Sequence, residues 1–169
     1  CSVRRQRQMC IRDRPKAIIN LAARTGVRKS TENPNVYYMT NVIGALNIAE
    51  LVDKYKIKNL IHASTSSVYG DSKEKKFTLN SETSKPISNY AASKKSSEVL
   101  LYAFSRLNNI NVTVLRFFTV YGPMGRPDMS PFIFNESNIR RKKISLFGNG
   151  LQKRDFTLSL IHISERTRL

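Results

Sequence analysis

Apolar residues along the chain follow two spacings, one continuous over short stretches and one helical. Continuous apolar runs at residues 16–23, 59–64 and 111–117 are typical of strands buried in a parallel sheet. Over residues 36–55 and 90–107 the apolar positions recur at helical spacing, which predicts two long helices. Strands that alternate with long helices predict the α/β fold class, with a parallel sheet covered on both faces.

The remaining segments complete this pattern. Residues 71–88 are polar and predict a surface loop, and a Gly/Pro-rich loop at 121–127 follows the third strand. A third helix is expected at 131–141 and a short strand at 144–147. Right-handed crossovers would bring the strand ends to one edge of the sheet, where folds of this class bind ligands.

Composition removes several classes of protein. The chain is 40% hydrophobic, which is enough for a packed core. No apolar run approaches the ~18–20 residues that span a bilayer, and the first residues lack the apolar stretch of a signal peptide. Two cysteines cannot form a disulfide scaffold, and no Cys/His spacing predicts a zinc or other metal site. A secreted knot, a membrane span and a zinc module are therefore excluded.

The net charge of +17 suggests a polyanion partner at first sight. Part of the excess positive charge lies at the ends of the chain, because residues 1–14 hold five Arg and one Asp. Both ends resemble translated sequencing-adaptor DNA, so we expect artefactual tails at 1–14 and 158–169 around a central segment, 15–157. A basic nucleic-acid-binding module stays as an alternative. The run Arg140–Lys143 fits either a solvated helix end or a nucleic-acid patch.

The sharpest chemical pattern is Tyr90 followed by Lys94 at the start of a predicted helix. A spacing of four residues places the phenol and the ammonium on one face, about one turn apart. The ammonium favours the phenolate, so the tyrosine can act as a base. Taken alone, the pattern also fits an ordinary surface pair.

Hydroxyl side chains follow the second predicted strand, in the run Ser64–Ser67. At the ligand-binding edge of the sheet they can bond an alcohol or a carboxylate, and a hydroxyl-rich turn with Gly70 as its hinge is the alternative. The third strand ends with Arg116, Thr119 and a Gly/Pro-rich turn.

In order and spacing, these motifs together resemble the extended short-chain dehydrogenase/reductase family, and within it the nucleotide-sugar 4-epimerases. The run from Arg116 to Met129 is most similar to the UDP-glucuronate 4-epimerase branch. Residues 20–28, 41–47 and 148–157 also match, so the resemblance covers essentially all of 15–157. It implies part of a Rossmann-type, doubly wound parallel sheet.

The resemblance implies that a tightly held NAD oxidises the sugar at C4 and then reduces the same carbon from the other face. Tyr90 would be the base, Lys94 would bond the nicotinamide ribose and lower the tyrosine pKa, and Thr65 would hydrogen-bond the substrate oxygen. Asn20 stands where many relatives carry histidine, and helix–sheet packing is the alternative role for the family-typical Asn41. The residues implied at the cofactor are Leu21, Ala22, Ala23, Asn41, Tyr90, Lys94 and Phe117.

For the UDP-sugar substrate, the resemblance implies that Ser66, Ser67 and Thr119 surround the C5/C6 end of the sugar. Arg126 would add charge near a carboxylate, and a salt bridge to Asp128 is its alternative. Arg154 would clamp the diphosphate.

Related dehydratases and decarboxylases usually carry an Asp or Glu in the turn that follows the second strand. None is present between Ala63 and Gly70, which favours an epimerase over a dehydratase or decarboxylase. The resemblance of the run from Arg116 to Met129 then implies the reaction of UDP-glucuronate to UDP-galacturonate. A UDP-glucose/galactose 4-epimerase and a nucleotide-sugar dehydratase remain alternatives.

The chain lacks the Gly-rich turn that seats the NAD pyrophosphate and the acidic residue that follows it. We therefore expect a central fragment, without the N-terminal strands and the C-terminal substrate domain, that binds NAD poorly and is inactive. The parent is expected to be a cytoplasmic enzyme with no nucleic-acid or membrane partner. The resemblance implies a homodimer formed through the helices at 36–55 and 90–107.

Overall fold

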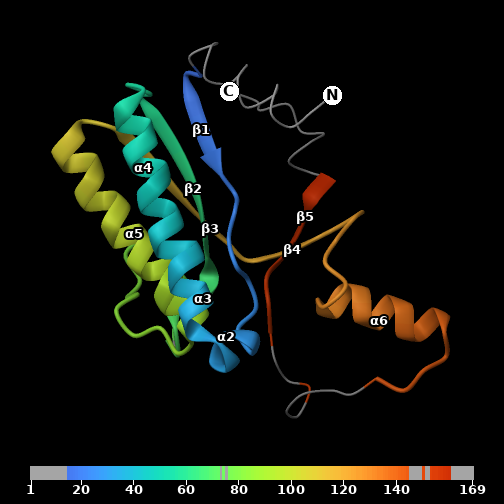
Figure 1. Ribbon diagram of the computed structural model, residues 1–169. Helices are drawn as coiled ribbons and strands as arrows, with labels where there is room; N and C mark the ends of the chain where they lie inside the picture. Colours follow the sequence, from blue (N-terminus) through green and yellow to red (C-terminus); the bar gives the residue numbers. More distant parts are fainter. Residues whose placement is uncertain (1–14, 73, 75, 145–149, 151–152, 161–169) are drawn as a thin grey trace. The chain divides into compact units, whose positions relative to one another are not determined.

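The computed structural model describes residues 15–72, 74, 76–144, 150 and 153–160 (Figure 1). The expected tail at 1–14, most of the one at 158–169, and all but Ile144 of the strand expected at 144–147 lie outside these residues. The chain forms two compact units, which divide between Arg116 and Phe117. Each unit has its own helices and strands.

The first unit is built on a three-stranded sheet of order β1-β2-β3. The strands are β1 (Ala17–Asn20), β2 (Asn59–Thr65) and β3 (Asn111–Phe117), and the last residue of β3, Phe117, is the first residue of the second unit. β1 runs parallel to β2, and Asn20 lies opposite His62 in the register. β3 starts beside the start of β2, since the Asn111 N–H donates to the Lys58 carbonyl at 2.8 Å. All three strands agree with the sequence prediction within a few residues, and the α/β class is confirmed.

The first predicted long helix is a series of helical segments. It comprises α3 (Pro34–Tyr38), a π-helix (Met39–Ile43) and α4 (Gly44–Lys54), preceded by the short α2 (Lys29–Glu32). Asn33 caps α3 with its side chain, and Pro34 fits the first helical position because its missing N–H needs no partner there. Sequence spacing did not predict the π-helical turn, which adds one residue to the repeat.

The second predicted long helix is α5 (Asn89–Asn108). It begins where the Ser88 hydroxyl accepts a hydrogen bond from the Ala91 N–H at 3.1 Å, and it ends at Asn109, which adopts a left-handed conformation. Helices α4 and α5 pack against each other and against β2 (Figure 1). Their apolar faces form the core with the strands and the residues that follow α4 and α5: Ala45, Ala49, Val52, Ile57, Leu60, Leu101 and Ile110.

The second unit contains a two-stranded parallel sheet, β4 (Thr119–Tyr121) with β5 (Phe156–Leu158), and the helix α6 (Ser130–Ile139). The prediction for 131–141 is confirmed within two residues. The two strands were not predicted because three residues are too few to show a period. β5 includes Leu158, the first residue of the expected C-terminal tail. Within the described ranges, no helix is both long and apolar enough to cross a membrane.

Candidate functional site

The hydroxyl-rich segment forms a tight turn at the carboxyl end of β2. Thr65 is the last residue of the strand, and a 3₁₀-helix (Ser66–Tyr69) follows it. The Thr65 hydroxyl caps this helix, accepting from the Ser67 N–H at 3.2 Å and donating to the Ser67 hydroxyl at 3.2 Å. Gly70 ends the turn with a φ of 61°, a conformation that glycine adopts without strain. The predicted catalytic hydroxyl and the two predicted substrate hydroxyls therefore share one turn.

Tyr90 and Lys94 lie in the first two turns of α5, which packs against β2 and against the 3₁₀-helix. The Tyr90 ring meets the Tyr37 ring edge-on, with 6.3 Å between their centroids. Lys94 is 2% exposed. Burial lowers the pKa of the Lys94 ammonium from 10.5 to about 8, although the charge of Glu98 acts in the opposite direction. The amine is therefore buried yet still largely protonated at neutral pH.

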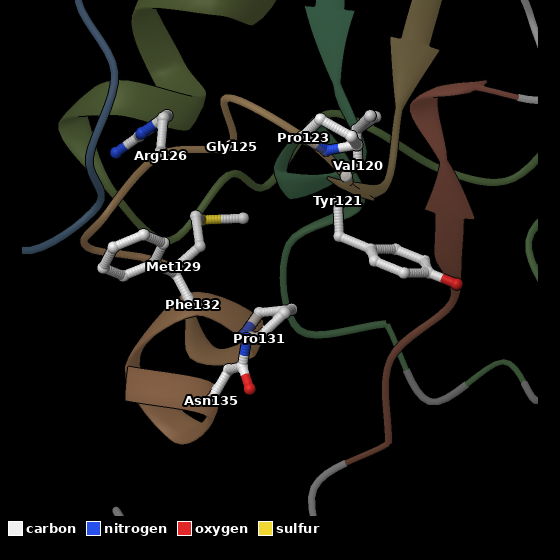
Figure 2. A pocket seen from close by; sticks show the side chains of 10 residues that line it. Val120, Tyr121, Pro123, Gly125, Arg126, Met129, Pro131, Phe132 and Asn135 are labelled. Atoms are coloured by element: carbon white, nitrogen blue, oxygen red, sulfur yellow. The ribbon is translucent and has the colours of Figure 1, made fainter. Parts of the chain in front are cut away.

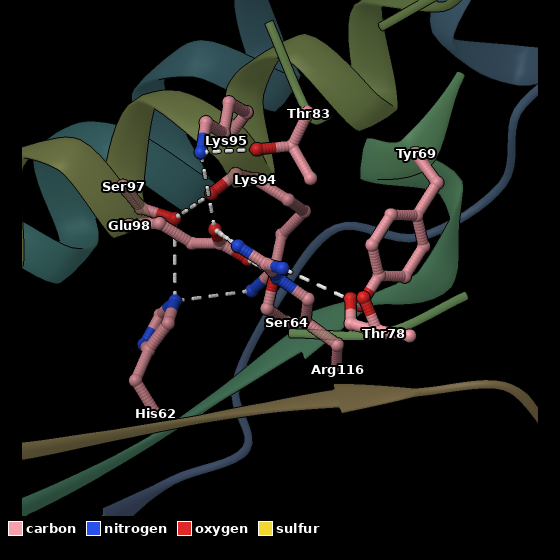
Figure 3. Close-up of polar contacts among 10 residues, drawn as sticks. All are labelled: His62, Ser64, Tyr69, Thr78, Thr83, Lys94, Lys95, Ser97, Glu98 and Arg116. Atoms are coloured by element: carbon pink, nitrogen blue, oxygen red, sulfur yellow. Dashed lines mark hydrogen bonds and ion pairs between the residues drawn. The ribbon is translucent and has the colours of Figure 1, made fainter. Parts of the chain in front are cut away.

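A buried histidine lies beside Lys94, with its Nε2 3.3 Å from the Lys94 Nζ (Figure 3). Burial is the larger cause and the charge of Lys94 the second in lowering the pKa of His62 from 6.5 to about 4, against a smaller opposing effect of Glu98. His62 is therefore neutral at physiological pH. From the sequence, His62 was expected only as part of a buried strand, and its contact with the lysine was not predicted.

Asn20 determines which nitrogen of His62 carries the proton. The Asn20 Oδ1 accepts from the Ala22 N–H at 3.2 Å, so its amide nitrogen faces His62 Nδ1 at 3.1 Å and donates to it. The proton of the neutral ring then lies on Nε2, which is 3.2 Å from the Ser97 hydroxyl. Since that nitrogen offers no lone pair, the ammonium protons of Lys94 remain available for an acceptor outside this cluster.

A second set of buried polar residues surrounds Glu98, four residues after Lys94 on α5. The Glu98 carboxylate accepts from the Ser64 hydroxyl at 2.5 Å and from the Arg116 guanidinium at 2.8 and 3.1 Å. Burial favours protonation of Glu98, but the hydrogen bonds from Arg116 and Ser64 and the charges of Arg116 and Lys95 outweigh it, so the pKa lies below its usual value. Glu98 was not predicted as a site residue; its position four residues after Lys94, on the same face of a predicted helix, is a signal that could have drawn attention to it.

Asn41 lies in the π-helix and holds the loop after β1. Its amide accepts from the Arg24 N–H at 2.7 Å, donates to the Arg24 carbonyl at 3.0 Å and also donates to the Ser93 hydroxyl at 2.9 Å. It therefore fixes the segment that follows Leu21, Ala22 and Ala23, the residues predicted at the cofactor. Asn41 therefore joins this loop to α5, a contact between a loop and a helix that differs from the helix–sheet packing considered from the sequence.

The second unit holds Phe117, Thr119, Arg126 and Arg154. It also holds a pocket of about 350 Å³ (Figure 2). Met129, Phe132 and Tyr121 are among the side chains that line the pocket, together with Arg126. Arg126 forms a bidentate ion pair with Asp128, with N–O distances of 2.9 and 2.5 Å, which is the alternative considered from the sequence. Arg154 is exposed, and its guanidinium donates to the Lys153 carbonyl at 2.9 Å.

The predicted site residues thus fall into two groups. The turn Thr65–Ser67, the pair on α5 and the loop 21–23 with Asn41 come together in the first unit. Phe117, Thr119, Arg126 and Arg154 belong to the second. Within the described residues, no group of three or more His, Cys, Asp or Glu side chains is arranged to hold a metal ion.

The chain is similar to proteins that are named as nucleotide-sugar enzymes. The family model described as NAD dependent epimerase/dehydratase family matches residues 2–159. A UDP-glucuronate 4-epimerase from Thermodesulfobacterium geofontis is 48% identical over 141 residues, which is 83% of this chain and 43% of that protein.

Solved structures show the same architecture. The UDP-glucuronic acid 4-epimerase from Bacillus cereus, in complex with UDP-glucuronic acid and NAD, matches with a TM-score of 0.81 and 31% identity over 94% of this chain and 52% of that one. A dTDP-glucose 4,6-dehydratase from Streptomyces venezuelae, with NAD bound, matches with a TM-score of 0.83 and 27% identity over 92% of this chain and 48% of that one. The chain spans about half the length of these structures and 43% of the curated epimerase.

Proposed function

The chain belongs to the NAD-dependent epimerase/dehydratase family, and from this premise we propose that its complete protein is a UDP-sugar 4-epimerase that converts UDP-glucuronate to UDP-galacturonate. The observation that carries the proposal is the turn Thr65–Ser67. It offers three hydroxyls and no carboxylate, and it packs against the helix of Tyr90 and Lys94. This donor set suits a reaction in which a hydroxyl proton is removed and returned.

The first unit fits the nicotinamide half of NAD. Lys94 offers a buried ammonium, and the neighbouring His62 ring does not accept a hydrogen bond from it. Among the described residues, no ion pair joins Lys94 to an acid. Lys94 would bond the nicotinamide ribose, and the loop 21–23, held by Asn41, would lie along the cofactor. When bound, NAD accepts a hydride from the sugar carbon and returns it.

The protein side chains would handle the proton. Tyr90 would take the proton of the 4-hydroxyl as general base and give it back after the sugar has turned. Lys94, charged at neutral pH, would favour the phenolate form of that tyrosine. The Thr65 hydroxyl would hydrogen-bond the same substrate oxygen and hold it in line with Tyr90.

The proposed preference for a sugar that carries a carboxylate rests on neutral hydrogen-bond donors and on arginine side chains. Ser66 and Ser67 would bond the carboxylate at C6, a role that the resemblance also implies for Thr119. Arg126 would add charge near that carboxylate by exchanging its bond to Asp128, and Arg154 would hold the diphosphate with its planar fork. The similarity to a UDP-glucuronate 4-epimerase at 48% identity supports this substrate over UDP-glucose.

The dehydratase alternative is supported by the fold match to a dTDP-glucose 4,6-dehydratase. It is disfavoured because elimination of water calls for a carboxyl acid/base, and no Asp or Glu stands between Ala63 and Gly70. We also infer a cytoplasmic homodimer for the complete protein, on the resemblance alone.

The test uses the complete protein, whose reading frame is obtained by sequencing the source DNA through both ends. The protein is incubated with NAD and, separately, with UDP-glucuronate, UDP-glucose and dTDP-glucose, and the products are identified by NMR. We expect UDP-galacturonate from the first and a loss of about 10² or more in kcat for Tyr90→Phe. Formation of a 4-keto-6-deoxy sugar would establish the dehydratase instead, and faster turnover of UDP-glucose would establish the other epimerase.

For the 169-residue chain by itself we propose no turnover. The same incubation, made with this chain in place of the complete protein, checks this point. Any UDP-galacturonate formed by the chain would contradict it.

A further inference from the structure

Glu98 occupies a central position in the first unit that the proposed reaction does not use. Its carboxylate is 7% exposed and lies on α5, one turn beyond Lys94. Hydrogen bonds reach it from Ser64 and from two nitrogens of Arg116, and the Lys95 ammonium lies 3.6 Å away. The donors therefore come from a strand end (β2), from a second strand (β3) and from the helix itself (Figure 3).

Arg116 extends this contact to the far side of the hydroxyl turn. Its Nη1 donates to the Tyr69 hydroxyl at 3.4 Å, and its guanidinium lies over the Tyr69 ring, 5.2 Å from the centroid. Tyr69 is the last residue of the 3₁₀-helix and donates to the Thr78 carbonyl at 3.3 Å. Phe77 stacks on its ring, with 4.5 Å between centroids. The residues Ser64, Tyr69, Lys95, Glu98 and Arg116 are referred to below as the Glu98 network.

Two anchored residues, Ser64 and Tyr69, lie on either side of the functional hydroxyls in the sequence. Ser64 comes directly before Thr65, and Tyr69 comes two residues after Ser67. Both ends of the turn are thus tied to one ion pair whose acid stands on the helix of Tyr90 and Lys94. A bidentate carboxylate–guanidinium pair fixes direction as well as distance, because its two parallel hydrogen bonds allow a single relative orientation.

We propose that Glu98 is a positioning residue, which sets the hydroxyls of Thr65, Ser66 and Ser67 at their working distance from Tyr90 through Ser64 and the Arg116–Tyr69 contact. The proposal rests on the proposed function, since the reaction needs that alignment. Apolar packing would hold the same elements together without fixing their register, whereas a buried polar network is satisfied in one arrangement. Small displacements at a reacting centre reduce the rate of the chemical step.

The test compares Ser64→Ala and Glu98→Gln with a matched control, Ser105→Ala. Ser105 lies near the other end of α5, where its hydroxyl donates to the Ile110 carbonyl at 2.7 Å, so the control also removes one serine hydrogen bond from the same helix. In the complete protein we expect kcat to fall about tenfold or more for the two network variants, and KM for UDP-glucuronate to rise as well, because the same turn carries the substrate hydroxyls of Ser66 and Ser67. Ser105→Ala should keep kcat within about twofold.

A second measurement does not depend on activity. In the 169-residue chain, amide hydrogen exchange is followed at residues 66–69 and in α4. We expect Glu98→Gln to speed exchange in the turn about tenfold or more, while α4 is unchanged, because the turn loses its anchor and the core does not. Arg116→Lys should give the same pattern, since lysine keeps the charge but not the fork or the stacking on Tyr69.

Two results would overturn the proposal. One is equal acceleration of exchange in the turn and in α4, which would make Glu98 a general stability element. The other is an unchanged kcat for both network variants in an active enzyme. If the unsubstituted complete protein converts no nucleotide sugar, the proposed function fails, and the exchange measurement then decides the positioning role without it.

Discussion

At the scale of single residues, the site places two basic groups in one buried space. Lys94 and His62 are 2% and 1% exposed, and 3.3 Å separates their nitrogens. Such a space does not hold two positive charges, and the group with the lower intrinsic pKa gives up its proton. With a pKa of about 8, Lys94 stays about ten to one protonated at pH 7, and His62 is neutral.

We therefore predict that the His62 ring titrates near pH 4 in the folded chain. Because this pKa is below the unfolded value of 6.5, the unfolded state binds more protons between these pH values. His62 leaves stability unaffected above pH 6.5, and stability falls progressively as the pH drops from 6.5 to about 4. A titration of the imidazole resonances by NMR, assigned with His62→Gln, measures the pKa directly.

The control for this prediction is Lys94→Met, which removes the second cause of the shift and keeps an apolar side chain of similar length. The pKa of His62 should rise in this variant, yet stay below 6.5 because the ring remains buried. A pKa of 6.5 in the unsubstituted chain would contradict the buried arrangement.

At the scale of elements, the geometry of the hydroxyl turn depends on how it ends. Gly70 has a φ of 61°, and a Cβ at this position would collide with the carbonyl oxygen of Lys85. We predict that Gly70→Ala lowers the free energy of unfolding by more than about 1–2 kcal/mol, the cost of the left-handed conformation alone. Urea unfolding followed by circular dichroism gives this value.

Gly44→Ala is the matched control, because Gly44 has a helical φ of −60° and an added Cβ would meet the Met39 carbonyl oxygen at an ordinary contact distance of 4.0 Å. The same measurement should show a gain of about 0.5–1 kcal/mol for this variant, since alanine loses less backbone entropy in a helix. A loss in both variants would mean that any added methyl group in this unit is unfavourable.

The π-helix is a second element with a specific consequence, since it presents Asn41 to the loop after β1. Asn41 is 1% exposed and its amide makes three hydrogen bonds. We predict that Asn41→Ala costs about 1–3 kcal/mol of unfolding free energy, because the Arg24 backbone loses its partners. The exposed Asn35 provides the control, and Asn35→Ala should change stability by less than about 0.5 kcal/mol. An equal loss of unfolding free energy in the two variants would contradict the role of Asn41 in holding the loop after β1.

At the scale of the whole molecule, β1 forms one edge of the three-stranded sheet in the described part of the chain. Its Ile19 is 62% exposed. An apolar strand edge is a template for pairing with another chain, so we predict that the 169-residue chain self-associates. Sedimentation velocity should show species larger than the monomer at micromolar concentration.

Ile19→Lys should reduce this association, because a charge on an edge strand opposes strand pairing. Leu79→Lys adds the same charge at a 90% exposed site in the loop and should leave the association unchanged. A monomeric unsubstituted chain would contradict the prediction, and so would equal effects of the two substitutions.

Much of the fold followed from the sequence because long elements carry a readable period. The strands at Ile18, Leu60 and Val112 and the helix of Leu101 were expected from apolar spacing alone. The two strands of the second unit were not expected, since three residues are too few to show a period. The π-helical turn around Asn41 was not expected either, because it interrupts the helical spacing of the apolar residues.

The sequence by itself determined the family, the α/β class and the pattern of Tyr90, Lys94 and the hydroxyl run, because these depend on residue type at a fixed local spacing. Only the tertiary structure decided that His62 faces Lys94 and that Glu98 joins Ser64 to Arg116. These contacts link residues on different strands and on a helix far along the chain. The protonation of these groups depends on their burial and on which side chain each one contacts. Neither property leaves a repeating pattern in the local sequence.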